Sequence, residues 1–153
     1  MRRIDWLLTQ YAKSHQDPVN KLIHWFCITL IFFSVIGLAW TIQFPCADNP
    51  FLNWGTVAMI PIAAYYLFLS RTLAVGMILL MCAFCICAHL LNTYVSTPLW
   101  LISTVIFIVS WVFQFIGHMV EGQKPSFLTD VRYLLVGPAW LMHSFYRRVG
   151  LPY

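Results

Sequence analysis

Charged residues are scarce in this chain of 153 residues, because Asp, Glu, Lys and Arg together make up only 9% of it. Soluble domains usually carry about 25% charged residues, so the composition argues against a soluble fold, and the mean hydropathy of +0.77 agrees. The net charge of +4 comes from basic residues that are too few and too scattered for a nucleic-acid partner. We therefore expect one all-α integral membrane domain over residues 1–153, surrounded by membrane lipids.

Disulfide and secretory features are also missing. The five cysteines are odd in number, and Cys82, Cys85 and Cys87 lie in an apolar run, where cysteine behaves as a small hydrophobic residue. No secretory signal is evident, because the first twenty residues are polar and amphipathic, with no small-residue cleavage site before Lys21,. A disulfide framework is therefore not expected.

Long uncharged stretches predict four transmembrane helices, since about 20 apolar residues cross a bilayer. The predicted spans are residues 18–44, 52–70, 72–94 and 98–121. The last two come from one uncharged run, Thr72–Val120, which is too long for one helix and is expected to break at Thr93–Pro98. Gly55 and Pro61 make the second span the least regular, although membrane helices tolerate proline.

An N-terminal amphipathic helix is predicted within residues 1–17. Ile4, Leu7, Leu8 and Tyr11 recur at i, i+3, i+4 and i+7, which gives one apolar stripe,. With basic residues beside it, such a helix suits an anionic membrane surface. Asp17-Pro18 ends this helix and begins the first span, with aspartate as the N-cap and proline at the first helical position.

The C-terminal segment, residues 129–148, is expected to stay at the interface. Its apolar part, Tyr133–Tyr146, reaches only about 21 Å as a helix at 1.5 Å per residue, and Gly137-Pro138 interrupts it. We therefore predict a pair of interfacial or re-entrant helices there, not a fifth span.

The basic residues test this topology. With four spans and a cytoplasmic N-terminus, all of them lie on the inner side: Arg2, Arg3, Lys13, Lys21, Arg71, Lys124, Arg132, Arg147 and Arg148. The two outer loops, near Asp48 and near Ser96, carry none, which is the positive-inside pattern. A fifth span would place Arg147 and Arg148 outside. The sequence thus predicts a multi-pass protein of a bacterial inner membrane or an endoplasmic-reticulum-type membrane.

This topology brings four of the five histidines to the cytoplasmic face. His15 and His24 flank the inner end of the first span, His118 lies at the inner end of the fourth, and His143 lies in the C-terminal segment. His89 lies about 27 Å along the third span at helical rise, at the opposite face. An interfacial histidine on its own is usually a polar residue that reaches toward water, and this is the interpretation for His89.

Each motif histidine has a polar neighbour on the same helical face. The pairs are Tyr11 with His15, Asn20 with His24, and Gln114 with His118, followed by Glu121,. A metal needs neutral imidazoles whose second ring nitrogen is held by a partner. We therefore predict a metal site with the ligands His15, His24, His118 and His143, supported by Tyr11, Asn20 and Gln114.

Other residues at this face have more than one interpretation. Glu121 ends a run of 49 uncharged residues and is expected to act at the site, as a ligand or otherwise, although it could instead pair with Lys124. His143 is equally well explained as an interface residue. Lys21, Lys124 and Arg132 serve the topology and are also expected to attract an acyl carboxylate.

The absent motifs narrow the metal chemistry. With five histidines and no H-x-x-H or H-x-x-x-H box, the chain is not a membrane di-iron hydroxylase or desaturase. No H-E-x-x-H motif and no Ser/His/Asp set is present either. A single metal with open positions remains, and imidazole ligands suit iron, zinc, copper or nickel. Haem between His24 and His118 is a weaker alternative, because both residues lie at helix ends among polar neighbours.

Two motifs resemble those of a known family. The stretch YAKSHQDPVNKLIHW (Tyr11–Trp25) before a long apolar helix, and the later stretch WVFQFIGHMVEGQKPSF (Trp111–Phe127), resemble the two signatures of the 2-hydroxy-fatty-acid dioxygenase family. That family includes a yeast endoplasmic-reticulum enzyme of phytosphingosine breakdown and many bacterial relatives. The two motifs occur in the family's order, and the resemblance spans nearly the whole chain. The middle, Phe51–Pro98, matches only in hydrophobicity.

The resemblance implies a small membrane enzyme that depends on Fe(II) and histidines. Such an enzyme uses O2 to shorten a 2-hydroxy fatty acid by one carbon, an α-oxidation. The motif histidines are His15, His24 and His118, with Glu121 expected to take part in catalysis. Two other classes stay open from the residues alone: a different single-metal lipid enzyme, such as a zinc hydrolase, and a non-catalytic scaffold or transporter. The residues predict no particular oligomeric state or acyl chain length.

Overall fold

The computed structural model describes residues 3–45, 49–124 and 133–152. In these ranges the chain forms six α-helices: α1 (Arg3–Lys13), α2 (Pro18–Trp40), α3 (Trp54–Leu69), α4 (Arg71–Tyr94), α5 (Leu99–Glu121) and α6 (Tyr133–Val149). The described residues contain no β-strand, only an isolated bridge between Gln43 and Asn53. The prediction of an all-α protein is confirmed.

Three helices, α2, α4 and α5, are long and apolar enough to cross a membrane. The predicted break between the third and fourth spans is also confirmed, since α4 ends at Tyr94 and α5 begins at Leu99. Helix α3 is apolar but has only 16 residues, which gives about 24 Å at helical rise against a hydrocarbon core of about 30 Å. The count of four spans therefore stays a prediction.

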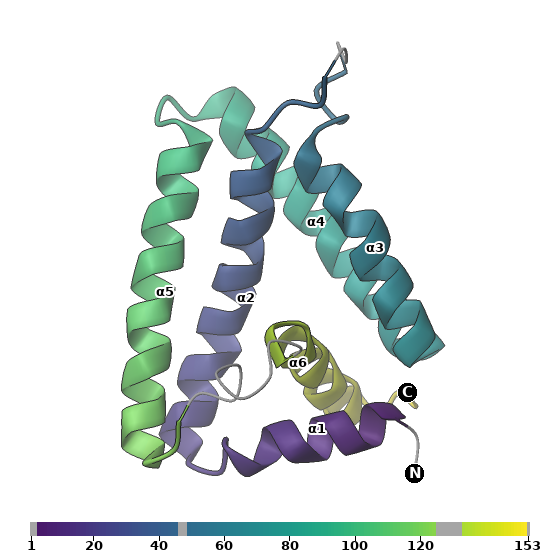
Figure 1. The fold of residues 1–153 in the computed structure, drawn as a ribbon, viewed down its shortest axis with the longest axis vertical. Helices are drawn as coiled ribbons and strands as arrows, with labels where there is room; N and C mark the ends of the chain where they lie inside the picture. The colour runs from purple at the N-terminus through teal and green to yellow at the C-terminus, as the bar shows by residue number, and fades with distance from the viewer. Residues whose placement is uncertain (1–2, 46–48, 125–132, 153) are drawn as a thin grey trace.

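The helices are arranged as two pairs that lean apart (Figure 1). Helices α2 and α5 lie side by side along their length and make the most extensive helix contact in the chain. Helices α3 and α4 form the second pair. Helices α1 and α6 lie at the lower ends of both pairs, and both chain termini are at this end.

Small residues allow the close approach of α2 and α5. A Cβ atom added to Gly117 on α5 would lie 2.5 Å from the Asn20 side-chain oxygen on α2, and one added to Gly37 on α2 would collide with the Ser103 hydroxyl on α5. Membrane helices commonly pack through such small residues, because apolar burial alone does not drive their association in lipid. This contact fixes the distance between the two helices that carry His24 and His118.

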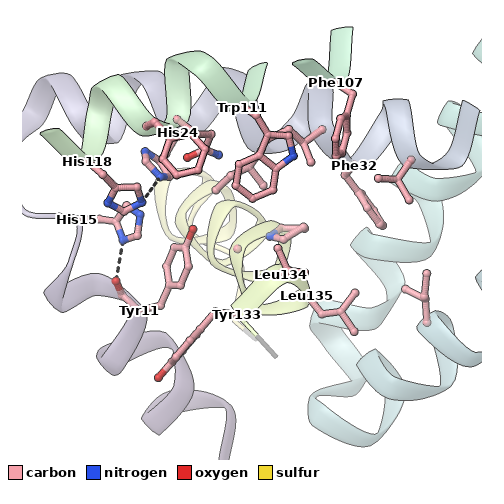
Figure 2. Close-up of a pocket in the computed structure, with 18 residues that line it drawn as sticks. Tyr11, His15, His24, Phe32, Phe107, Trp111, His118, Tyr133, Leu134 and Leu135 are labelled. Atoms are coloured by element: carbon pink, nitrogen blue, oxygen red, sulfur yellow. Dashed lines mark hydrogen bonds between the residues drawn. The ribbon is translucent and has the colours of Figure 1, made fainter. Parts of the chain in front are cut away.

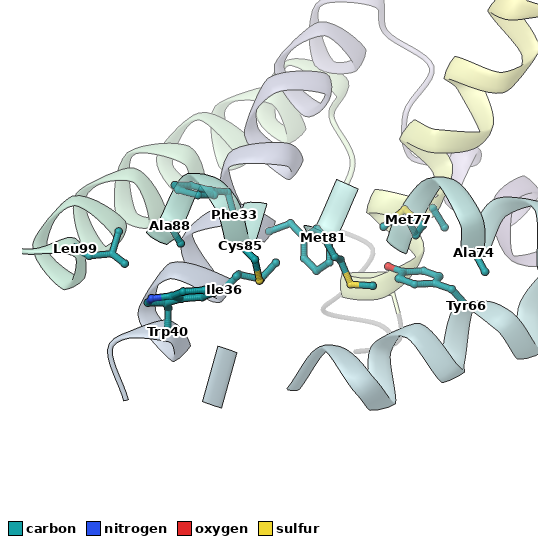
Figure 3. Close-up of a cluster of buried hydrophobic side chains, with 12 residues drawn as sticks. Phe33, Ile36, Trp40, Tyr66, Ala74, Met77, Met81, Cys85, Ala88 and Leu99 are labelled. Atoms are coloured by element: carbon teal, nitrogen blue, oxygen red, sulfur yellow. The ribbon is translucent and has the colours of Figure 1, made fainter. Parts of the chain in front are cut away.

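The main apolar core lies between α2, α3, α4 and α5 (Figure 3). Its buried members include Phe33, Trp40, Tyr66, Met77 and Met81. The Tyr66 hydroxyl donates a hydrogen bond to the backbone oxygen of Leu135 at 2.8 Å, and so ties α3 to α6.

The apolar stripe of α1 packs against protein, as part of a second core that contains Ile28, Val136, Trp140 and Leu141. The amphipathic pattern of α1 predicts that this stripe faces the membrane surface. The helix and its stripe are confirmed, but the stripe is buried against α6 and α2, because two amphipathic segments at the same face can cover each other.

Helix α6 corrects the prediction of a helix pair. It runs unbroken through Pro138 for 17 residues, although a proline inside a helix costs about 3 kcal/mol. Tertiary contacts offset this cost: residues Val136 to Leu141 are all buried. The Tyr146 hydroxyl adds a hydrogen bond to the backbone oxygen of Thr72 on α4. Residues 129–132 of the predicted segment lie outside the described residues.

Candidate metal centre

Three buried histidines meet where α1, α2 and α5 converge (Figure 2). His24 is carried by α2 and His118 by α5, while His15 follows the end of α1. One ring nitrogen from each lies within 4.8 Å of those of the other two. The Nε2 atoms of His24 and His118 are 3.2 Å apart. The convergence predicted for these three histidines is therefore present.

The chain turns sharply between His15 and His24, and Asp17 shapes that turn. The Asp17 carboxylate accepts hydrogen bonds from the backbone N–H groups of Val19 and Asn20, at 2.8 and 3.1 Å. It is thus the predicted N-cap of α2, with Pro18 in the first turn,. The turn lets α1 lie across the end of α2, which brings His15 over His24, with ring centroids 4.2 Å apart.

Backbone carbonyls determine which nitrogen of two imidazoles carries the proton. The Nδ1 atom of His15 is 2.8 Å from the Tyr11 oxygen, and the Nδ1 atom of His24 is 2.9 Å from the Asn20 oxygen. A carbonyl oxygen only accepts, so each Nδ1 must donate a proton and each Nε2 keeps its lone pair. Metal-binding histidines are usually held in this way.

The geometry fits a metal ion. Two imidazole nitrogens bound to one ion at about 2.0–2.1 Å, with angles between about 90° and 110°, lie about 2.9–3.4 Å apart. The 3.2 Å between the Nε2 atoms of His24 and His118 is within this range. His15 Nε2 is buried and has no hydrogen-bond partner among the described residues, so its lone pair is available to the same ion.

Burial also favours the neutral, metal-binding form of His15. Because removal from water disfavours the charged imidazolium, burial lowers the pKa of His15 below its ordinary value,. The stacked Tyr11 ring, with its centroid 4.3 Å from that of His15, is buried as well, and burial raises the pKa of its phenol. Tyr11 therefore stays a neutral hydrogen-bond donor.

Glu121 holds the chain next to His15 instead of facing the three ligand atoms. Its carboxylate accepts hydrogen bonds from the backbone N–H of Gln16 at 2.7 Å, the backbone N–H of Asp17 at 2.8 Å and the Asn20 amide at 3.0 Å. It thus fastens the end of α5 to the turn between α1 and α2. Its direct participation in catalysis stays a prediction.

The side chains expected to support the imidazoles have other surroundings. Tyr11 and Asn20 hold His15 and His24 through their backbone oxygens. The Asn20 amide instead contacts Glu121, and Gln114 lines a cavity. The pairs Tyr11–His15 and Asn20–His24 are in contact, but through backbone oxygens and not through the side chains that their residue types suggest. The support of His118 by Gln114 stays a prediction.

The fourth predicted ligand, His143, lies on α6 outside the group of three, so its role as a ligand stays a prediction. His89 lies far from this group, with its ring 4.6 Å from that of Phe51, and its place at the other membrane face stays a prediction. Lys21 begins α2, Lys124 is exposed, and Arg132 lies outside the described residues.

A cavity of about 590 Å³ opens beside the histidines (Figure 2). The polar lining residues are Tyr11, His15, His24, Gln114, His118 and Tyr133. Apart from Trp111, with its indole N–H, the remaining lining residues are apolar. Its size is typical of sites for small molecules. The apolar lining, for instance Trp111 and Phe107, was not predicted. Its signal in the sequence is helical spacing, because Phe107, Trp111 and His118 lie on one face of α5.

Comparisons with known proteins identify a family model and a similar protein. A family model described as "2-hydroxy-palmitic acid dioxygenase Mpo1-like" matches residues 1–149. The chain is also similar to the 2-hydroxy-palmitic acid dioxygenase MPO1 of Saccharomyces cerevisiae, with 26% identity over 144 residues, which cover 92% of this chain and 78% of the yeast protein. No solved structure matches the chain.

Proposed function

This chain belongs to the Mpo1-like family, and from that premise we propose that it is a metal-dependent membrane dioxygenase acting on 2-hydroxy fatty acids. The observation that carries the proposal is the group of His15, His24 and His118 at one end of a large apolar cavity. A long-chain lipid with a polar, chelating head matches both the histidines and the apolar cavity. The name of the yeast relative supports the substrate class and the reaction.

We propose Fe(II) as the metal. Imidazole ligands also suit zinc, copper and nickel, so the choice of iron is supported by the dioxygenase chemistry of the relative and by the open positions that three histidines leave. When bound, Fe(II) would supply an electron source for O2 and a Lewis acid for the hydroxyl and carboxylate of the substrate. The proposed reaction consumes one O2 and gives a fatty acid shorter by one carbon, with the carboxyl carbon released as CO2 and with water as the other product.

The residues of the chain have separable roles in this proposal. The backbone oxygens of Tyr11 and Asn20 orient two imidazoles, so that their Nε2 atoms face one point,. Glu121 keeps the turn that follows His15 in place. The apolar walls receive the acyl tail and exclude water from the histidines, which limits side reactions.

We further propose that the site faces the cytoplasm. The basic residues at the ends of α1 and α6, Lys13, Arg147 and Arg148, belong to the end of the molecule that holds the three histidines. Lys21 begins α2 at this end, and Lys124 follows α5 there. Positive charge marks the cytoplasmic side of membrane proteins. The membrane is a bacterial inner membrane or an endoplasmic-reticulum-type membrane.

Metal analysis after anaerobic purification, followed by oxygen-uptake measurements, tests the proposal. We expect about one iron per chain, as three histidines form one site, and oxygen uptake with 2-hydroxypalmitate but not with palmitate. His24→Ala and His118→Ala should abolish both iron binding and oxygen uptake. His89→Ala, the same change at the other end of the molecule, is the matched control and should preserve both.

The outcomes separate the competing classes. Iron that survives both His24→Ala and His118→Ala would contradict the assigned site. Bound zinc without oxygen uptake would favour a zinc-dependent lipid hydrolase. A protein that binds no metal and consumes no oxygen would favour a non-catalytic scaffold or transporter.

A further inference from the structure

The cavity beside the histidines contains one side-chain amide, that of Gln114. Gln114 is only 7% exposed and lines the cavity. Within the described ranges its side chain has no hydrogen-bond partner, unlike the amide of Asn20, which is bonded to Glu121. Buried polar groups are nearly always hydrogen-bonded in folded proteins. An amide left without a protein partner in an apolar cavity is therefore suited to bind a ligand.

No lysine or arginine in the described part of the chain lines this cavity. Two of the three cations expected from the sequence to attract a carboxylate do not line it: Lys124 is exposed beyond the end of α5, and Lys21 is not among the lining residues. The third, Arg132, lies outside the described residues. A cation within the membrane would itself be costly to bury. Among the described residues, an acyl carboxylate in this cavity therefore meets only uncharged donors.

Two uncharged donors face the same space. Gln114 lies one helical turn before His118 on α5 and lines the cavity next to it,. The Tyr11 hydroxyl, from α1, points into the cavity in Figure 2. Its position is fixed, because the ring stacks on His15 and because Gly137 lies directly behind it: a Cβ on Gly137 would be 3.1 Å from the Tyr11 oxygen.

We propose that the Gln114 amide and the Tyr11 hydroxyl bind the carboxylate of the fatty acid, each donating one hydrogen bond to it. The identity of the ligand as a fatty acid rests on the proposed function. The presence of a carboxylate site built from uncharged donors does not. Hydrogen bonds to an ionised acceptor are shorter and stronger than those between neutral groups. The two residues thus hold the head group against the histidines while the tail extends along the apolar walls.

Equilibrium binding of palmitate and of 1-hexadecanol tests the proposal. Both have the same tail, and palmitate lacks the 2-hydroxyl group, so binding is measured without turnover. The metal-loaded, full-length protein in lipid nanodiscs is titrated anaerobically. The quantity compared is the preference for the acid, which is the ratio of the two dissociation constants.

Gln114→Leu should lower the preference for palmitate about tenfold or more, because a hydrogen bond to a charged group is lost while the apolar lining is preserved. Gln114→Glu should lower this preference further by like-charge repulsion. Tyr11→Phe should lower the preference without changing the binding of 1-hexadecanol. Gln43→Leu, the same change at an exposed position at the other end of the molecule, should leave the preference unchanged. Iron content is measured for each variant as a check on folding.

The proposal is overturned if Gln114→Leu and Gln114→Glu leave the preference unchanged, or if they weaken acid and alcohol equally. The same experiment distinguishes this inference from the proposed function. If the Gln114 variants lose the preference and the unaltered protein shows no oxygen uptake, the carboxylate site is retained and the dioxygenase is rejected. If the unaltered protein shows normal oxygen uptake and the Gln114 variants keep the preference, the dioxygenase is retained and the carboxylate site is rejected.

Discussion

Asn20 connects the metal-binding histidines with the rest of the site at the scale of single residues. Its backbone oxygen accepts the Nδ1 proton of His24, while its side-chain amide donates to Glu121. It is fully buried and lies against Gly117, where a Cβ would collide with it. One residue thus couples the orientation of an imidazole to the contact between α2 and α5.

Glu121 gives a prediction at this scale. Glu121→Gln removes the charge and leaves one acceptor oxygen where two oxygens now accept three hydrogen bonds,. Because these bonds hold the turn between His15 and His24, we expect iron affinity to fall about tenfold, the lower end of the range for outer partners of metal ligands. The lower end applies because water screens this partly exposed carboxylate. Competition with a calibrated chelator measures the affinity.

Asp5→Asn is the control for this prediction, since it makes the same chemical change in the first turn of α1. It should leave the iron affinity unchanged. Complete loss of iron in Glu121→Gln would indicate that Glu121 is itself a ligand, and no change at all would indicate that the turn holds its shape without it.

At the scale of elements, one face of α5 serves the whole cavity. Phe107, Trp111, Gln114 and His118 recur at helical spacing and all line it. Phe107 is about 16 Å from His118 at 1.5 Å per residue, which is close to half of a hydrocarbon core of about 30 Å. The cavity is therefore about as long as one leaflet's acyl chain, and Phe107 and Phe32 lie at its far end (Figure 2).

We accordingly predict that Phe107 limits acyl chain length. Phe107→Ala should shift the preferred substrate toward longer 2-hydroxy acids, because removing the ring lengthens the cavity. Oxygen uptake with a series of acids of graded length measures the preference as relative kcat/KM. Phe113→Ala is the matched control, since Phe113 is half exposed on α5 and does not line the cavity. Equal profiles for both variants and the unaltered protein would place the tail elsewhere.

The elements also show what the sequence was able to predict. Uncharged runs predicted α2, α4 and α5, because the bilayer sets the length of an apolar helix regardless of its neighbours. The Asp17 cap was predicted because capping depends on adjacent residues alone,. The positions of the three histidines followed from the topology.

Tertiary contacts account for what was not predicted. Local rules correctly mark Gly137-Pro138 as unfavourable in a helix, but they do not include the burial of α6 that offsets this cost. The apolar stripe of α1 has the same pattern whether lipid or α6 covers it. Two of the three partners of Glu121 are backbone N–H groups more than a hundred residues away, and no residue type in the sequence identifies them.

At the scale of the whole molecule, the chemistry and the lipid environment are separated along one axis. The histidines, the turn between α1 and α2, and both termini share one end (Figure 1). The apolar part of the cavity extends from there along α2 and α5, with α6 forming another wall. Under the proposed function, a 2-hydroxy fatty acid that enters from one leaflet would keep its head near the polar interface and its tail in an apolar environment.

This arrangement predicts that both termini face the cytoplasm. Helices α2 to α5 alternate in direction (Figure 1), and the short α3 can be accommodated by local thinning of the bilayer at modest cost. With four crossings the chain returns to its starting side. Reporter fusions that are active only in the cytoplasm should be active after residue 153 and before residue 1, and inactive when inserted in the loop at Ser96. A cytoplasmic reporter that is inactive after residue 153 would show that α3 does not cross the membrane, and would place Arg147 and Arg148 on the outer side against the positive-inside pattern.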